Sequence, residues 1–187
     1  MAVMSISAAR PANACLKPIQ KNISYRAKGE HAMEFSGSQT ITVSIERVWA
    51  YLLDVNKVAA CAPGFRSLEE LEPEHWKAVI AAGVGPVKAK FTLDVTRPEM
   101  QEPNYMVVKG RGKAPGSAVE LEGRMRLVAE GAERTRMDWN AHVVVSGTLA
   151  SVGGRLMSST AEKLTGQFFD CLKANLLAVD TAEASSH

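Results

Sequence analysis

The sequence predicts an α+β fold in which a curved antiparallel sheet wraps around one long C-terminal helix. After residue 33, most of the chain consists of short segments that alternate apolar and polar residues between turn signals, a pattern typical of strands. Two short helical patterns follow the first strand, and apolar residues at three- and four-residue spacing fill the last part. A sheet with one apolar face needs a cover, and the long helix is the element available to provide it.

Capping residues delimit the first elements. Glu34–Val43 alternates and predicts a strand. Ser44 is a good N-cap for a helix over Ile45–Leu53, and Asp54 can cap a second short helix. The second helix must end before Cys61, because a Pro-Gly pair follows shortly after it.

Six further strands are expected, and alternation divides three of them into an apolar and a charged face. Phe91 and Leu93 share a side opposite Lys90 and Asp94, and the later strands repeat this division. Between such a sheet and its helix a void commonly remains, where a ligand can bind. The expected strands are Phe65–Leu71, Trp76–Ala82, Val87–Thr96, Tyr105–Gly112, Ser117–Ala129 and Arg134–Ser146.

The C-terminal helix is expected over Leu149–Val179, where only three glycines interrupt the pattern. We therefore expect one domain over residues 33–179 and a flexible tail over residues 180–187. Ala150, Gly154, Ser158 and Gly166 form an incomplete row of small residues on this helix. Such a row permits close approach of the protein's own sheet, or alternatively of a partner enzyme or a second copy in a homo-oligomer.

Residues 1–32 differ from the rest of the chain. They hold five basic residues and one acidic residue, and they lack a lasting helical or strand period. The Ser/Ala/Arg-rich composition resembles a transit peptide, but a disordered tail, an upstream start codon or a cloning remnant accounts for it equally simply. We expect a disordered N-terminal extension without a chemical role.

Charge and cysteine content exclude several classes of function. The net charge is +2 overall and −2 once residues 1–32 are set aside, so nucleic-acid binding is not expected. No apolar stretch is long enough for a membrane span. The three cysteines, Cys15, Cys61 and Cys171, are far apart, which predicts reduced thiols in a cytoplasmic protein.

Five stretches of the chain carry a resemblance to a known family: Met33–Gly37, Val48–Leu52, Cys61–Gly64, Ala82–Phe91 and Leu149–Phe169. Together they resemble the G-subunit family of carbon monoxide dehydrogenase, part of the START/Bet v 1-like (SRPBCC) superfamily of helix-grip ligand carriers. The resemblance covers roughly residues 33–178. Its most specific motif is Gly-Val-Gly-Pro-Val-Lys.

The resemblance implies a non-catalytic binding protein. Members accompany molybdenum hydroxylases, recruit them to the membrane and bind a quinone-like molecule in the helix-grip cavity. Because the chain ends at His187 without an apolar anchor, we expect at most peripheral contact with the inner face of the membrane. Of the family's functions, we therefore expect this protein to share the carriage of a quinone or lipid, or electron transfer for the hydroxylase, rather than membrane anchoring.

The expected cavity lies between the apolar sheet face and the long helix. The alternative is that these side chains simply fill the core. Thr160, Gln167 or Trp139 could donate a hydrogen bond to a quinone ring. The expected ligand-binding residues are Phe91, Leu93, Met106, Val108, Met125, Trp139, Val143, Leu156, Met157, Thr160, Leu164 and Phe168.

Two glycine-rich stretches, Gly83–Pro86 and Gly110–Lys113, superficially resemble nucleotide loops. Neither has the required spacing or a following helix to hold a phosphate, so both are interpreted as tight turns or strand kinks. Such loops often lie at the mouth of a helix-grip cavity. The expected mouth residues are Gly83, Val84, Gly85, Pro86 and Gly112.

Catalysis has little support. His142 falls on the charged face, His75 begins a strand, and neither has local partners for a metal site or a catalytic triad. Cys61 is expected to be a packed thiol. We therefore expect no catalytic residue, no metal and no covalent cofactor. The alternatives to a ligand carrier are an assembly or maturation factor without ligand, and a helix-grip cyclase or hydrolase.

Overall fold

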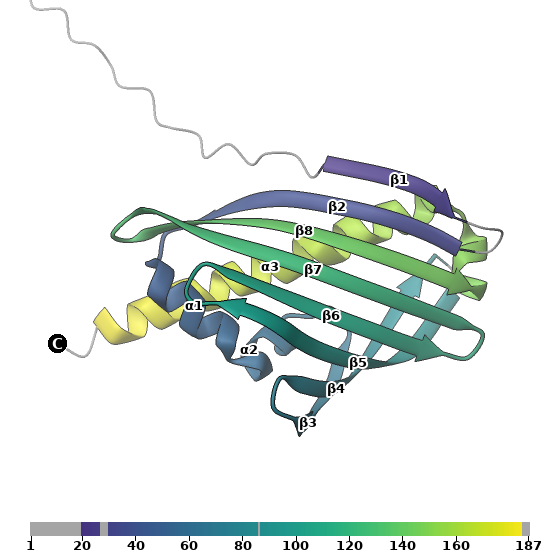
Figure 1. Ribbon diagram of the computed structural model, residues 1–187, viewed down its shortest axis with the longest axis horizontal. Helices are drawn as coiled ribbons and strands as arrows, with labels where there is room; N and C mark the ends of the chain where they lie inside the picture. Colours follow the sequence, from purple (N-terminus) through teal and green to yellow (C-terminus); the bar gives the residue numbers. More distant parts are fainter. Residues whose placement is uncertain (1–19, 27–29, 86, 185–187) are drawn as a thin grey trace, which may run out of the picture.

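The computed structural model describes residues 20–26, 30–85 and 87–184. One antiparallel sheet of eight strands, in the order β1-β2-β8-β7-β6-β5-β4-β3, curves around the long helix α3 (Figure 1). The elements are β1 (Gln20–Arg26), β2 (Glu30–Ile41), α1 (Ile45–Leu53), α2 (Val55–Ala60), β3 (Phe65–Glu72), β4 (His75–Val84), β5 (Val87–Gln101), β6 (Tyr105–Ala114), β7 (Ser117–Gly131), β8 (Arg134–Gly147), the 3-10 helix η1 (Thr148–Val152) and α3 (Gly154–Ala184).

The predicted fold class is confirmed, and the boundaries follow the sequence signals closely. Helix α1 has the predicted bounds, with Val48, Trp49 and Leu52 buried. Helix α2 begins after Asp54, whose carboxylate accepts a hydrogen bond from the backbone N–H of Lys57 at 3.2 Å. That bond satisfies one of the free donors in the first turn of the helix.

The long helix begins later and ends later than predicted. Residues Thr148–Val152 form the separate helix η1, and α3 starts only at Gly154. Gly153, between them, has φ +88°, a conformation that favours glycine and breaks the helical run. Helix α3 continues to Ala184, into the range expected as a tail, and the flexibility of that tail stays a prediction.

Two strand segments lie within residues 1–32, which were expected to form a disordered extension; the disorder of that extension stays a prediction. Strand β1 pairs antiparallel with β2, with Gln20 opposite Ser36, and β2 itself begins at Glu30. Without β1, the outer edge of β2 would present unpaired N–H and C=O groups. Residues 1–19 and 27–29 lie outside the described residues.

The half of the molecule that holds α1 and α2 is filled with side chains. These helices lie beside the C-terminal part of α3 (Figure 1), where Leu172 and Leu176 are buried. Trp139 and Phe169 stack with ring centroids 5.1 Å apart. We call this half the packed end; it comprises α1, α2, Leu127, Met137, Trp139, Phe169, Leu172 and Leu176.

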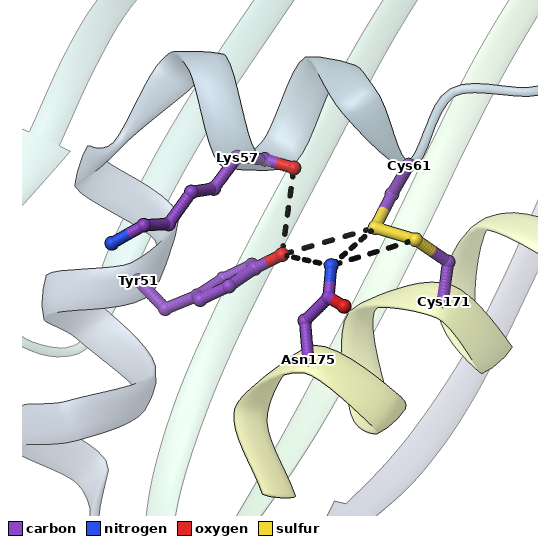
Figure 2. The surroundings of a disulfide bond; sticks show 5 residues. All are labelled: Tyr51, Lys57, Cys61, Cys171 and Asn175. Atoms are coloured by element: carbon purple, nitrogen blue, oxygen red, sulfur yellow. Dashed lines mark hydrogen bonds between the residues drawn. A yellow bond between two sulfur atoms is a disulfide. The ribbon is translucent and has the colours of Figure 1, made fainter. Parts of the chain in front are cut away.

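A disulfide between Cys61 and Cys171 ties the end of α2 to α3 at the packed end (Figure 2). Asn175 Nδ2 donates to Tyr51 Oη at 2.9 Å and lies 3.4 Å from Cys61 Sγ. The prediction of reduced thiols is therefore wrong for these two cysteines. They are 110 residues apart in sequence and meet only because the sheet folds α3 back onto α2.

Candidate functional site

The candidate site is an apolar cavity of about 200 Å³ between α3 and the concave face of the sheet. It lies at the opposite end from α1 and α2, under η1 and the β4–β5 hairpin; we call this half the cavity end. Among the described residues that line it, Thr160 alone has a polar side chain. The lining residues are Met33, Ile80, Ala82, Val84, Phe91, Leu93, Val119, Val143, Val145, Leu149, Met157, Thr160, Ala161 and Leu164.

Next to the strands that line the cavity, β6 changes from large to small residues along its concave face. At the packed end, that face carries Met106 and Val108, whereas toward the cavity end it carries Gly110, Gly112 and Ala114. A Cβ at Gly112 would lie 2.6 Å from a methyl carbon of Val119 and 3.2 Å from Leu93 Cγ. The side chains of Val119 and Leu93, which line the cavity, therefore lie directly over Gly112, and no described residue of β6 itself lines the cavity.

Six of the predicted binding residues line this cavity: Phe91, Leu93, Val143, Met157, Thr160 and Leu164. They come from β5, β8 and α3. The structure thus brings together residues as far apart in the sequence as Phe91 and Leu164, which are separated by 73 positions. Whether they contact a ligand stays a prediction.

The other six predicted binding residues lie elsewhere. Met106 and Trp139 are buried in the packed core, and Val108, Met125 and Phe168 pack against that core. Leu156 is 39% exposed outside the cavity. The sequence alternation identifies the concave face correctly, but it does not indicate how far along each strand the side chains stop filling the interior.

Some of the predicted mouth residues lie at the cavity or in the adjoining turn, and others do not. Val84 lines the cavity, Gly83 is exposed near the end of β4, and Gly85 forms the β4–β5 turn with φ +58°. Pro86 lies outside the described residues. Gly112 is not in a mouth loop: it lies inside β6, whose hydrogen-bond register with Val119 is regular, and the turn follows at Gly116.

Seven lining residues were missed by the sequence interpretation. Apolar–polar alternation could have identified four of them: Val119 and Val145, which fall on the apolar face of their strands, and Ile80 and Ala82 on β4. Met33, Leu149 and Ala161 come from segments whose orientation toward the sheet only the structure shows. The missed residues are Met33, Ile80, Ala82, Val119, Val145, Leu149 and Ala161.

The hydrogen-bond donors expected for a quinone ring are not free inside the cavity. Thr160 Oγ1 donates to the carbonyl oxygen of Leu156 at 2.9 Å. Gln167 is exposed to solvent. Trp139 Nε1 is buried without a hydrogen-bond partner, but it lies in the packed core rather than at the cavity wall.

The titratable groups of the described residues lie outside the cavity. His75 Nε2 is 3.0 Å from an oxygen of Asp94 near the start of β4, and His142 Nδ1 is 3.6 Å from Glu34 on the convex face. Within the described residues, no group of three His, Cys, Asp or Glu side chains has the geometry to hold a metal ion. None of the described helices combines the length and apolarity needed to span a membrane.

The family comparison agrees with this geometry. A model of the family described as the G-subunit of carbon monoxide dehydrogenase (CoxG) matches residues 37–177. The chain belongs to the CoxG family. The matched range includes α1, most of the sheet and nearly all of α3, and so contains nearly the whole cavity. CoxG is a family of non-catalytic subunits of the ligand-binding type. No curated protein sequence matches the chain.

Solved structures confirm the START-like fold. A conserved protein from Geobacillus kaustophilus has TM-score 0.73 and 24% identity over 78% of this chain and 95% of its own. A START superfamily protein from Mycobacterium smegmatis has TM-score 0.62 and 13% identity over 78% and 98%. The ZhuI aromatase/cyclase from Streptomyces sp. R1128 has TM-score 0.58 and 15% identity over 78% and 94%.

Three of the four small residues on the last helices face the protein's own interior. Ala150, Gly154 and Ser158 are buried, and Ser158 Oγ donates to the carbonyl oxygen of Gly154 at 2.9 Å. A Cβ at Gly166, by contrast, would meet nothing within 4 Å. The row therefore packs on the sheet over its first part, and a homo-oligomer stays a prediction.

Proposed function

We propose that this CoxG-family protein binds the apolar part of a small molecule in the cavity between α3 and the sheet, without catalysing a reaction on it. The observation that carries this proposal is the wall of the cavity, which is apolar at every described position except Thr160. A general acid or base has no counterpart there, which is what an enzyme of the cyclase or hydrolase type would need.

The volume sets the size of the group that fits. An apolar cavity of about 150 Å³ binds benzene, whereas sites for drug-sized ligands begin near ~300 Å³. At about 200 Å³, this cavity takes one ring or a short length of hydrocarbon chain. Removing five methylene groups from water contributes about 4 kcal/mol, equivalent to a Kd near ~1 mM. Tighter binding requires further contacts at the opening.

The cellular role that we propose follows from the family. The bound molecule, a quinone or a lipid, would be carried to or from a molybdenum hydroxylase, at the inner face of the membrane. A second candidate, an assembly factor without ligand, requires a filled core, and the packed end provides one. The cavity favours the carrier over the assembly factor.

The test combines extraction with a matched pair of variants on α3. Mass spectrometry of an organic extract of the freshly purified protein should detect a quinone or a lipid. Leu164→Arg, which places a charge in the cavity, should abolish both this content and uptake on titration. Leu177→Arg is the control, because Leu177 is 44% exposed on the same helix. An empty extract and no uptake of added quinone or decan-1-ol by the unmodified chain would contradict the proposal.

A further inference from the structure

The cavity accepts hydrocarbon better than it accepts a polar ring. The one hydroxyl in its described wall, on Thr160, already donates its proton to the Leu156 carbonyl at 2.9 Å. The oxygens of a quinone ring accept hydrogen bonds but cannot donate them. A buried ring would therefore leave its oxygens without partners, which is costly, whereas a saturated chain loses nothing on entering.

One side of α3 forms the rim of the cavity. Gly85, in the β4–β5 turn, lies against Leu156: a Cβ at Gly85 would be 2.6 Å from its Cδ2 atom. Residues four, seven and eleven positions after Leu156 fall on the same side of the helix. They are Thr160, which lines the cavity, and the exposed residues Lys163 and Gln167.

Lys163 is therefore an ammonium group one helical turn from the cavity wall. Within the described part of the chain, no acidic side chain forms an ion pair with it, nor with the exposed Lys88 and Arg155 at the same end of the molecule. Some exposed cations of the sheet are paired, as Lys109 is with Glu122 at 3.3 Å. The rim thus offers an unneutralised positive charge beside an apolar hollow.

We infer that the ligand is an anionic amphiphile with a single hydrocarbon chain, of the fatty-acid class, whose chain occupies the cavity and whose head group stays outside at Lys163. The inference rests on the proposed function that the cavity binds an apolar group. It adds the ligand class: the chain is selected by the apolar wall and the head group by charge. The amide of Gln167 can donate a second hydrogen bond to a carboxylate at the rim.

The test compares decanoate with decan-1-ol, which share a chain length and differ in charge. Calorimetric titration of the full chain should show decanoate binding about three- to fivefold tighter than decan-1-ol at low salt, the range of an exposed ion pair. The preference should vanish in high salt, because exposed charges are screened. A decyl-substituted benzoquinone should bind no more tightly than decan-1-ol.

Variants assign the preference to one side chain. Lys163→Gln should abolish the preference for decanoate while leaving the affinity for decan-1-ol unchanged, and Lys163→Arg should retain it. Lys77→Gln is the matched control, because Lys77 is an exposed lysine near the other end of the sheet. Circular dichroism verifies the fold of each variant.

The outcomes separate this inference from the proposed function. If decan-1-ol binds as tightly as decanoate, if the preference survives in Lys163→Gln, or if the benzoquinone binds most tightly, the ligand class is wrong and the cavity still binds apolar groups. If none of the three probes binds, the proposed function fails and the inference fails with it.

Discussion

The two ends of the sheet share the helix α3 but have opposite interiors. At the packed end, Leu172 and Met137 are fully buried, and the indole of Trp139 lies so close to Gly37 that a Cβ there would be 2.8 Å from it. At the cavity end, Val119 lies equally close to Gly112, but a cavity of about 200 Å³ remains between the sheet and α3 residues such as Leu164. One helix and the same strands run through both ends, but α1 and α2 add their side chains only to the packed end.

The comparison indicates that one end of the molecule provides stability and the other end provides the binding site. The packed end holds the chain together through α1, α2, the disulfide and the aromatic pair. The cavity end gives up packing contacts, which costs stability but leaves a site. We expect substitutions at the first end to change the free energy of unfolding and substitutions at the second end to change binding.

Removing the disulfide should have the largest effect on stability. A cross-link that closes a loop of 110 residues restricts the unfolded chain, and its loss costs about 4–5 kcal/mol. Urea denaturation of the Cys61→Ser/Cys171→Ser double variant should show this loss, and a reductant should produce the same shift in the unmodified protein. Unchanged stability in both cases would contradict a stabilising role for the bond.

A matched pair of leucines tests the comparison itself. Leu172→Ala should destabilise the protein by about 3–5 kcal/mol, because it empties a fully occupied site. Leu164→Ala should cost only about 1–2 kcal/mol, since that side chain already borders a void. Urea denaturation measures both values. Equal losses would mean that the two ends are packed alike.

Adding a methyl group behind the cavity wall should weaken binding. In Gly112→Ala the new methyl group would lie 2.6 Å from Val119, so the wall must shift into the hollow, at a cost of about 1–2 kcal/mol in stability. Affinity for decan-1-ol should fall about fourfold for each displaced methylene, as titration would show. The control is Gly123→Ala, where the nearest atom is 3.9 Å away; an equal effect there would contradict the account.

The smallest effect concerns the helix cap at Asp54. Asp54→Ala should cost about 1 kcal/mol. Its hydrogen bond from the Lys57 backbone N–H, together with the Lys57 side chain, lowers the pKa of the carboxyl below its ordinary value of 3.8. This contribution is therefore complete above pH 3.8 and is lost as the pH falls through the lowered pKa. Denaturation at several acidic pH values should show that Asp54→Asn lacks this dependence.

The sheet and helices were largely predictable from the sequence, because alternation and capping are local signals. Helix α1 follows Ser44, and α2 lies between Asp54 and the Pro-Gly pair, as predicted. Strand β1 was not predicted because its sequence has no clear apolar–polar alternation. It is a strand because it pairs with β2. Gly153 was visible but not recognised as a break between η1 and α3.

The candidate site was only half predictable, for a physical reason. Alternation identifies the concave face of the sheet, but the hollow depends on how side chains from five strands, η1 and α3 meet in space. Met125 and Trp139 face the same side as Val143, yet they fill the core. Arg97 shows the same limit: it is 8% exposed and donates to Glu74 at 3.0 Å, a pairing that no local pattern indicates.

The most direct test of the account is a titration with decan-1-ol followed by methyl NMR of the full chain. Methyl groups at the cavity end, those of Val119, Val143 and Leu164, should shift with a single saturable Kd. Those of Leu127 and Leu172 at the packed end should not move. Saturable shifts at the packed end, or no saturable shifts at either end, would contradict the claim that this CoxG-family protein holds its ligand in the cavity.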